Sequence, residues 1–252
     1  MRVVLKNVCK DIKGARVLDN VNLELESGRV YGFKGKNGSG KTMLMRAISG
    51  LIKVKGEIEI DGEILGKDFS FPPSIGILIE NPSFVQEYTG LKNLEMLACI
   101  KNNTGIEDIR HVMEQVGLDP DDKRTYRKYS LGMKQKLGIA AAYMENPDII
   151  ILDEPTAGLD PEERNRFVSM IRSLPDEMVV LFSTHMIEDV ELCCDKVIVM
   201  NNGRICYDGS CKKLIDEAQN CIEKEKYKGN YQRAVLADGY MCVMKGLVKN
   251  EA

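Results

Sequence analysis

The 252-residue sequence has little that would suit a membrane-spanning, secreted or nucleic-acid-binding protein. No apolar run approaches the roughly 18 residues that a membrane-spanning helix needs. The first residues, from Met1 on, lack the apolar segment of a secretory leader, so none is expected. The formal net charge of −3 argues against a dedicated nucleic-acid binder, and no motif is repeated along the chain. We therefore expect a cytoplasmic protein with one large α/β domain, with or without a helical insertion.

Metal-binding spacing is also missing. The eight cysteines are scattered, and only Cys193 and Cys194 are adjacent. Without a secretory leader these residues are expected to be reduced thiols rather than disulfides or zinc ligands. Of the two histidines, His111 lies in an amphipathic pattern typical of a surface helix, whereas His185 follows an apolar strand pattern.

A glycine-rich segment fits the pattern G-x-x-x-x-G-K-[ST], which binds phosphates. A strand-like run at residues 29–33 precedes it, and a helical pattern at residues 42–48 follows it. In this setting backbone N–H groups point at phosphate oxygens, which disfavours the alternative of a plain glycine turn. Lys41 would reach the β- and γ-phosphates of ATP, and the Thr42 hydroxyl would bind Mg²⁺. The predicted ATP-binding residues are Gly35, Lys36, Asn37, Gly38, Ser39, Gly40, Lys41 and Thr42.

An apolar run at residues 149–152 ends in two acids, Asp153 and Glu154. Such a run predicts a strand of a parallel sheet that is buried on both faces. Ligands of these sheets bind beyond the carboxyl ends of the strands, where the glycine loop would also end. Asp153 then suits the Mg²⁺ shell, and Glu154 suits orienting or deprotonating the attacking water. Taken alone, the pair could also be a helix-capping pair of acids.

These segments, in this order, resemble those of the ATP-binding cassette (ABC) ATPases from about residue 3 to residue 214. A divergent form of the family's signature motif stands at Ser130, Leu131, Gly132 and Met133, and Ser130 suits a helix N-cap. The resemblance implies that this helix start faces the γ-phosphate of ATP held by a partner subunit. An ordinary capped helix is the alternative that the residues themselves leave open.

The same resemblance implies further roles and a fold. Asp160 would be the acid that couples two sites, and His185 would act with Glu154 in catalysis. The expected fold is a P-loop NTPase, α/β with a RecA-like parallel sheet core, an antiparallel β subdomain and a helical subdomain. The ATPase domain would span residues 2–220, with the helical subdomain at about 84–145. Residues 221–252 would form an appendage in which we find no interpretable motif.

Turn residues predict the coarse organisation. Residues 2–33 and 56–65 are expected to be rich in antiparallel strands, with hairpins at Ser27-Gly28 and Asp61-Gly62. Another hairpin is expected at Asn202-Gly203. Strands and helices should alternate over residues 148–200, as a parallel sheet requires.

Two positions depart from the family pattern. Where relatives stack an aromatic residue on adenine, this chain has Ile12, so we expect weaker ATP binding and weaker discrimination between ATP and GTP. Where relatives carry a glutamine that touches Mg²⁺ and senses the membrane partner, it has Glu80, followed by Asn81 and Pro82. Glu80 would remain a metal ligand and a coupling residue. Together with the signature segment it resembles the subfamily that serves bacitracin and lantibiotic export or self-immunity.

The implied function is the ATP-hydrolysing subunit of an ABC transporter, which uses ATP and Mg²⁺ to energise export of a peptide, antibiotic or similar substrate. Its partners would be separate transmembrane permease subunits and a second ATPase subunit in a head-to-tail homodimer, with no nucleic acid. It would lie in the cytoplasm, on the inner face of the cell membrane. The alternative is a soluble ABC ATPase without a transport role, such as a component of iron–sulfur assembly. A small-molecule kinase would not explain Ser130 or His185.

Overall fold

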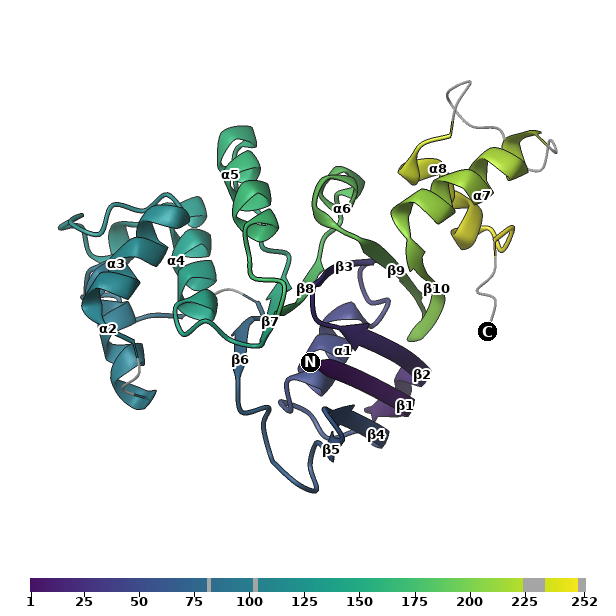
Figure 1. Ribbon diagram of the computed structural model, residues 1–252, viewed down its shortest axis with the longest axis horizontal. Helices are drawn as coiled ribbons and strands as arrows, with labels where there is room; N and C mark the ends of the chain where they lie inside the picture. Colours follow the sequence, from purple (N-terminus) through teal and green to yellow (C-terminus); the bar gives the residue numbers. More distant parts are fainter. Residues whose placement is uncertain (81–82, 102–103, 224–233, 249–252) are drawn as a thin grey trace.

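The computed structural model describes residues 1–80, 83–101, 104–223 and 234–248. In this part of the chain a six-stranded sheet of order β10-β9-β3-β8-β7-β6 forms the centre (Figure 1). All its strands run parallel except β10, which is antiparallel to β9. The strands are β3 (Arg29–Lys34), β6 (Ile75–Leu78), β7 (Ile149–Asp153), β8 (Val179–Ser183), β9 (Lys196–Asn201) and β10 (Arg204–Ser210).

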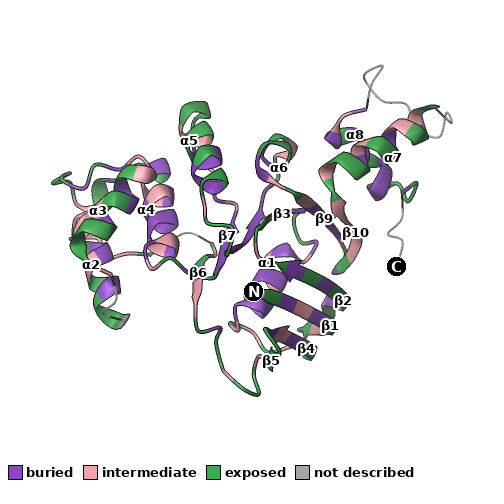
Figure 2. Ribbon diagram, viewed as in Figure 1, coloured by how far each residue is buried: buried purple, intermediate pink, exposed green. Residues whose placement is uncertain are grey.

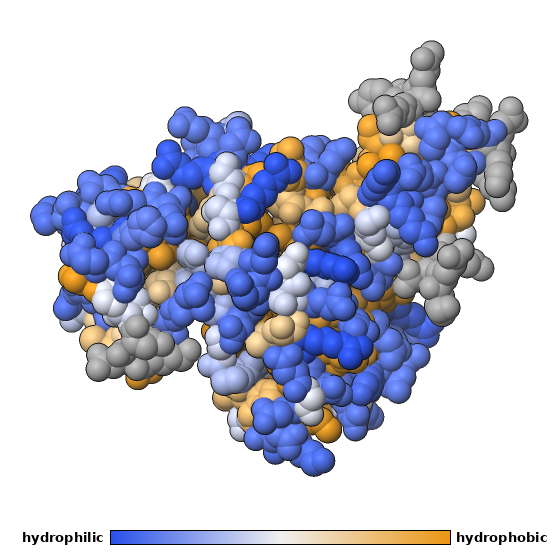
Figure 3. Space-filling model, viewed as in Figure 1, coloured by the Kyte–Doolittle hydropathy of each residue, from blue (hydrophilic) through white to orange (hydrophobic). Residues whose placement is uncertain are grey.

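Strands β7 and β8 are buried at every position, which accounts for their unbroken apolar sequences. Figure 2 shows this buried centre between more exposed elements. Seen from the same side, most of the surface is hydrophilic, and apolar residues appear as patches between the elements (Figure 3).

A second, antiparallel sheet has the order β2-β1-β4-β5. Its strands are β1 (Arg2–Ile12), β2 (Ala15–Glu26), β4 (Lys55–Ile60) and β5 (Glu63–Ile64). Alternate residues of β2, among them Val21, Leu23 and Leu25, are buried, as expected for a sheet with one face on a core. That core also contains Leu44 and Met45 of helix α1 (Lys41–Ile48), so the antiparallel sheet and the parallel sheet enclose α1.

Helices lie beyond the other face of the parallel sheet, some packed on it and some packed on one another. They are α2 (Gly90–Lys101), α3 (Ile106–Gln115), α4 (Leu131–Tyr143), α5 (Pro161–Arg172) and α6 (Ile187–Cys193), with a short 3₁₀ helix at Tyr126–Lys128. A continuous core joins residues of α2, α3 and α4 to Ile150, Leu152 and Phe182 of the sheet. The segment from α2 to α4 forms the helical part of the molecule on the left of Figure 1.

Helices α7 (Cys211–Glu223) and α8 (Leu236–Met244) pack on each other and on β9, β10 and α6. Our predicted boundary at residue 220 lies inside α7. Leu236 and Val243, which follow this boundary, therefore pack in one core with Leu214 and Ala218, which precede it.

One of the three predicted hairpins is wrong. The turn at Ser27-Gly28 leads from the antiparallel sheet into the parallel one, because β3 pairs with β8 and β9 instead of β2. Residues 29–33 consequently do not belong to the antiparallel part. The hairpin at Asp61-Gly62 joins β4 to β5, and Asn202-Gly203 joins β9 to β10 with positive φ at both turn residues.

Candidate functional site

The glycine loop connects β3 to α1, as predicted. Gly40 has φ = 106°, and a Cβ there would lie only 2.8 Å from the carbonyl oxygen of Val17. Only glycine fits this conformation and this close approach. The helix begins directly after it, with the Leu44 N–H bonded to the Gly40 carbonyl at 2.8 Å. The loop thus presents the N-terminus of α1, a favourable place for phosphate.

The ammonium of Lys41 lies on the inner side of the loop. It donates hydrogen bonds to the carbonyls of Gly35 at 2.8 Å and of Lys36 at 3.4 Å. Burial lowers the pKa of Lys41. The Ser39 hydroxyl is buried nearby and has no hydrogen-bond partner among the described residues. A pocket of about 380 Å³ opens over this loop, with Val17, Asp153 and Glu154 among its lining residues.

Asp153, at the end of β7, joins the loop to the neighbouring strand. The Thr42 hydroxyl donates to Asp153 Oδ2 at 2.7 Å, and the Ser183 hydroxyl donates to Asp153 Oδ1. A hydroxyl oxygen and a carboxylate oxygen side by side are ligands of the kind that Mg²⁺ prefers. Thr42 and Asp153 therefore fit a magnesium site.

Glu154 and His185 lie at the ends of the adjacent strands β7 and β8. His185 Nδ1 is 2.7 Å from Glu154 Oε2, and the His185 N–H donates to the same oxygen at 3.2 Å. Glu154 has φ = 51°, a conformation that non-glycine residues rarely adopt. Its N–H bonds to the hydroxyl of Ser183 at 3.0 Å, and its carbonyl accepts from Gln135 at 3.1 Å. These contacts stabilise the strained conformation and direct the carboxylate toward His185.

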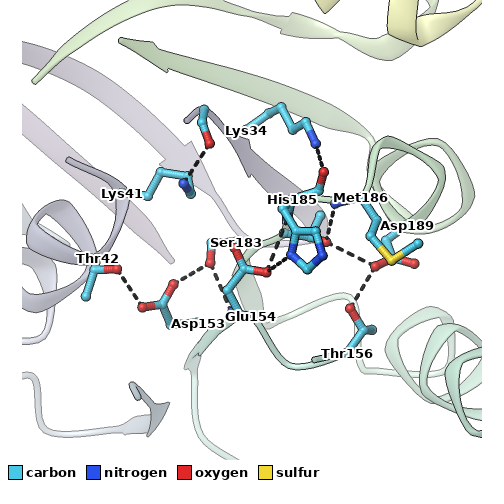
Figure 4. A network of polar contacts seen from close by, with 12 residues as sticks. Lys34, Lys41, Thr42, Asp153, Glu154, Thr156, Ser183, His185, Met186 and Asp189 are labelled. Carbon is cyan, nitrogen blue, oxygen red and sulfur yellow. Dashed lines mark hydrogen bonds and ion pairs between the residues drawn. The ribbon is translucent and has the colours of Figure 1, made fainter. Parts of the chain in front are cut away.

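A buried carboxylate supports the loop that carries His185 (Figure 4). Asp189 Oδ2 accepts from the hydroxyls of Thr156 at 2.7 Å and Thr184 at 3.1 Å. The Thr184 hydroxyl in turn accepts from the Met186 N–H at 3.0 Å. Asp189 thereby links the segment after Glu154 to the segment around His185.

The signature residues lie elsewhere, and no hydrogen bond of the described residues joins them to the glycine loop. Ser130 is the N-cap of α4, and its hydroxyl accepts from the Met133 N–H at 3.2 Å. The exposed Leu131 lies next to Gly158, where an added Cβ would come within 2.8 Å of it. The signature helix thus contacts the segment that leads to Asp160.

Asp160 is the N-cap of α5. Its carboxylate accepts from the Glu163 N–H at 2.8 Å, and the Glu163 carboxylate accepts from the Asp160 N–H at 3.3 Å. This reciprocal pair is a capping box. The coupling role of Asp160 stays a prediction.

The structure does not bring Glu80 to Thr42 and Asp153. Its carboxylate forms an ion pair with Arg46, one helical turn beyond Thr42 on α1. Thr42 and Arg46 are four residues apart and therefore share a face of α1. Glu80 is thus paired with Arg46 on that face instead of with Thr42. Asn81 and Pro82 lie outside the described residues. Ile12 is exposed at the end of β1 and is not among the residues that line the pocket over the loop, so its place under the base stays a prediction.

Sequence analysis missed several residues of this network. Lys34 donates to the carbonyl of His185, Gln135 holds Glu154, and Thr156 and Asp189 support the His185 loop. A polar residue at the end of the apolar strand β3 was a visible signal for Lys34. For the others, the sequence contains no sign of which distant backbone group they contact.

Comparison with known proteins identifies the family. A model described as ABC transporter matches residues 18–157. YybJ of Bacillus subtilis (strain 168), an uncharacterized ABC transporter ATP-binding protein, is 43% identical over 202 residues, which are 79% of this chain and 92% of that protein. The bacitracin transport ATP-binding protein BcrA of Enterococcus faecalis is 30% identical over 93% of this chain and 78% of its own length. The lantibiotic transport ATP-binding protein SrtF of Streptococcus pyogenes is 34% identical, over 82% and 91% respectively.

The fold also agrees with a solved structure. The ATP-binding cassette MJ0796, a dimer in a post-hydrolysis state with ADP and phosphate, matches with a TM-score of 0.75 at 24% identity, over 82% of this chain and 98% of that chain. Among the described residues, no helix combines the length and apolarity needed to cross a membrane. BcrA and SrtF confirm the predicted resemblance to the bacitracin and lantibiotic subfamily. The chain therefore belongs to the ABC transporter family, as an ATP-binding subunit that hydrolyses ATP.

Proposed function

We propose that this chain hydrolyses Mg·ATP at the edge of its parallel sheet and so energises export of a peptide, antibiotic or similar substrate through separate membrane subunits. The observation that carries the proposal is the convergence of Lys41, Thr42, Asp153, Glu154 and His185 at the carboxyl ends of β3, β7 and β8.

Each of these residues has a distinct part in hydrolysis. The N–H groups of the loop and Lys41 bind the β- and γ-phosphates. Thr42 and Asp153 would hold Mg²⁺, which would supply positive charge to offset that of the phosphate oxygens. Glu154 orients a water molecule and accepts its proton as the water oxygen bonds to the γ-phosphorus and the bond to the departing ADP oxygen breaks. His185, fixed on Glu154 Oε2, keeps that carboxylate in place.

A second copy would complete each site. Ser130 and Leu131 are exposed at the N-terminus of α4, which offers N–H groups and a hydroxyl to an anion outside its own chain. In a head-to-tail dimer this end would meet the γ-phosphate bound by the partner copy. The structurally similar MJ0796 is a dimer, which supports a second copy as the partner.

The membrane partner and substrate class rest on the relatives, which are named for bacitracin and lantibiotic transport. We place the protein on the cytoplasmic face of the membrane, bound to permease subunits. Glu80 would signal the nucleotide state to these subunits, by leaving its ion pair with Arg46 and moving to the metal site.

The test is purification of this chain from its own membranes in mild detergent, with identification of the proteins that accompany it. Recovery of a protein with several membrane-spanning helices, in near-equal amount, is the expected result. Recovery of soluble proteins alone would contradict the transport role and favour the soluble alternative, while leaving the ATPase chemistry intact.

A further inference from the structure

Lys34, the last residue of β3, is a buried charge that the proposed chemistry does not use. The residue is 7% exposed, and burial lowers the pKa of its ammonium. A buried ammonium costs free energy unless it has close partners. Lys34 directly precedes Gly35, the first residue of the phosphate loop, so this charge is buried at the edge of the site.

The main partner of Lys34 is the backbone of the His185 loop. Its ammonium donates to the carbonyl of His185, and the nearby carboxylates of Glu154, Glu188 and Asp189 favour its charge. The His185 N–H and Nδ1 both contact Glu154 Oε2. Lys34 therefore fixes the carbonyl of the same residue whose N–H and ring contact Glu154.

The other partner of Lys34 comes from the C-terminal part of the chain. Its ammonium lies 5.5 Å from the centre of the Tyr240 ring, a distance at which a cation and an aromatic face attract each other. Tyr240 belongs to α8 and packs on the core that α8 shares with α6, β9 and β10. Helix α8 thus reaches the ammonium of Lys34 through the ring of Tyr240.

We propose that Lys34 is a positioning residue for ATP hydrolysis, which fixes the carbonyl of His185 and thereby the contact between His185 and Glu154, and that Tyr240 of α8 holds Lys34 in this place. Helix α8 then contributes to the rate of hydrolysis through Tyr240 and Lys34. The inference rests on the roles proposed above for Glu154 and His185.

The first experiment compares steady-state hydrolysis by the full-length wild type and Lys34→Met, which keeps the side-chain length but removes the charge and the donors. We expect kcat to fall by about ten- to a hundredfold, the cost of a slightly displaced catalytic group, with KM for ATP within about twofold. The melting temperature should stay equal or rise, because the cost of burying the ammonium is removed. Lys34→Arg, which keeps a charged donor, should recover part of kcat.

A native kcat in Lys34→Met would overturn the inference. So would a fall in kcat accompanied by a matching loss of ATP binding and of melting temperature, because that pattern indicates a structural role only. Glu154→Gln is measured beside it. Native hydrolysis by Glu154→Gln would contradict the proposed function itself, whereas loss of hydrolysis there with a native Lys34→Met would contradict only the positioning role.

The second experiment tests the helix. Tyr240→Leu keeps an apolar side chain but removes the ring and should lower kcat in the same sense as Lys34→Met. The matched control is Met241→Ala, an exposed neighbour on α8, which should leave kcat unchanged. If Tyr240 acts through Lys34, the double variant should be no slower than Lys34→Met alone. Full additivity of the two effects, or an unaffected Tyr240→Leu, would remove α8 from the proposal.

Discussion

His185 Nδ1 lies 2.7 Å from Glu154 Oε2, although the two residues are 31 positions apart in the chain. They follow β8 and β7, which are paired in parallel, with Asp153 opposite Ser183. Parallel neighbours end at the same edge of a sheet, so consecutive strand ends deliver their polar residues to one place. The topology itself therefore assembles the acid and the histidine beside the glycine loop.

The first prediction concerns Glu154. Glu154→Gln should reduce hydrolysis by about 10²–10⁴-fold, the usual contribution of a general base, because an amide accepts no proton from water. ATP binding should remain, since Lys41 and the loop are untouched, and a closed dimer should accumulate in ATP. Single-turnover hydrolysis and size-exclusion chromatography measure the two effects. The exposed Glu162→Gln, on α5, is the control and should behave as wild type.

The second prediction concerns the composite site of the dimer. Lys41→Ala and Ser130→Arg should each be nearly inactive alone, the first through the phosphate loop and the second through the signature. In a mixed dimer, the intact loop of one copy meets the intact signature of the other, so one active site is restored. Each mixed dimer should have up to about half of the activity of a wild-type dimer, because one of its two sites is intact. No recovery, with mixed dimers verified by differently tagged copies, would exclude the head-to-tail arrangement.

The sequence predicted those parts of the site that depend on local pattern. The glycine loop, the apolar strand before Asp153 and the N-cap at Ser130 follow from short-range rules and lie where expected. Contacts set by side-chain geometry could not be predicted. The pairing of Glu80 with Arg46 depends on where the end of β6 lies relative to α1, which no local pattern gives. The turn after Ser27 connects two sheets because β3 pairs with β8, which lies about 150 residues later in the chain.

The third prediction concerns base recognition. Ile12 offers no aromatic face, so ATP and GTP should bind with similar affinity. Ile12→Tyr should tighten ATP binding, by the roughly 0.5–1.5 kcal/mol that aromatic pairs contribute. Titration with fluorescent ATP and GTP analogues measures both statements, with Ile12→Leu as the control of unchanged character. A strong preference of the wild type for ATP would show that another residue recognises the base.

The fourth prediction concerns the buried support of the His185 loop. Thr156→Val keeps the shape of the side chain but removes one hydrogen bond to Asp189, whose other carboxylate oxygen forms only a long ion pair with Arg164, at 3.7 Å. The free energy of unfolding should fall by about 1–3 kcal/mol, the cost of leaving a buried polar group less satisfied. Urea denaturation measures this loss. Ser169→Ala, which removes an exposed hydroxyl bonded within α5, should stay within about 0.5 kcal/mol of wild type.

The fifth prediction concerns the cysteines, all of which are free. Burial raises the pKa of Cys193 to about 12 and that of Cys211 to about 11, so both remain protonated at pH 8. The thiolate is the reactive form, and Cys99 is exposed on α2, so a thiol reagent should modify Cys99 first. Cys99→Ser should remove the fastest phase of labelling, while raising the pH toward 11 should speed modification of Cys211 by increasing its thiolate fraction. Labelling of Cys193 as fast as Cys99 in the native protein would show that the C-terminal end of α6 opens readily.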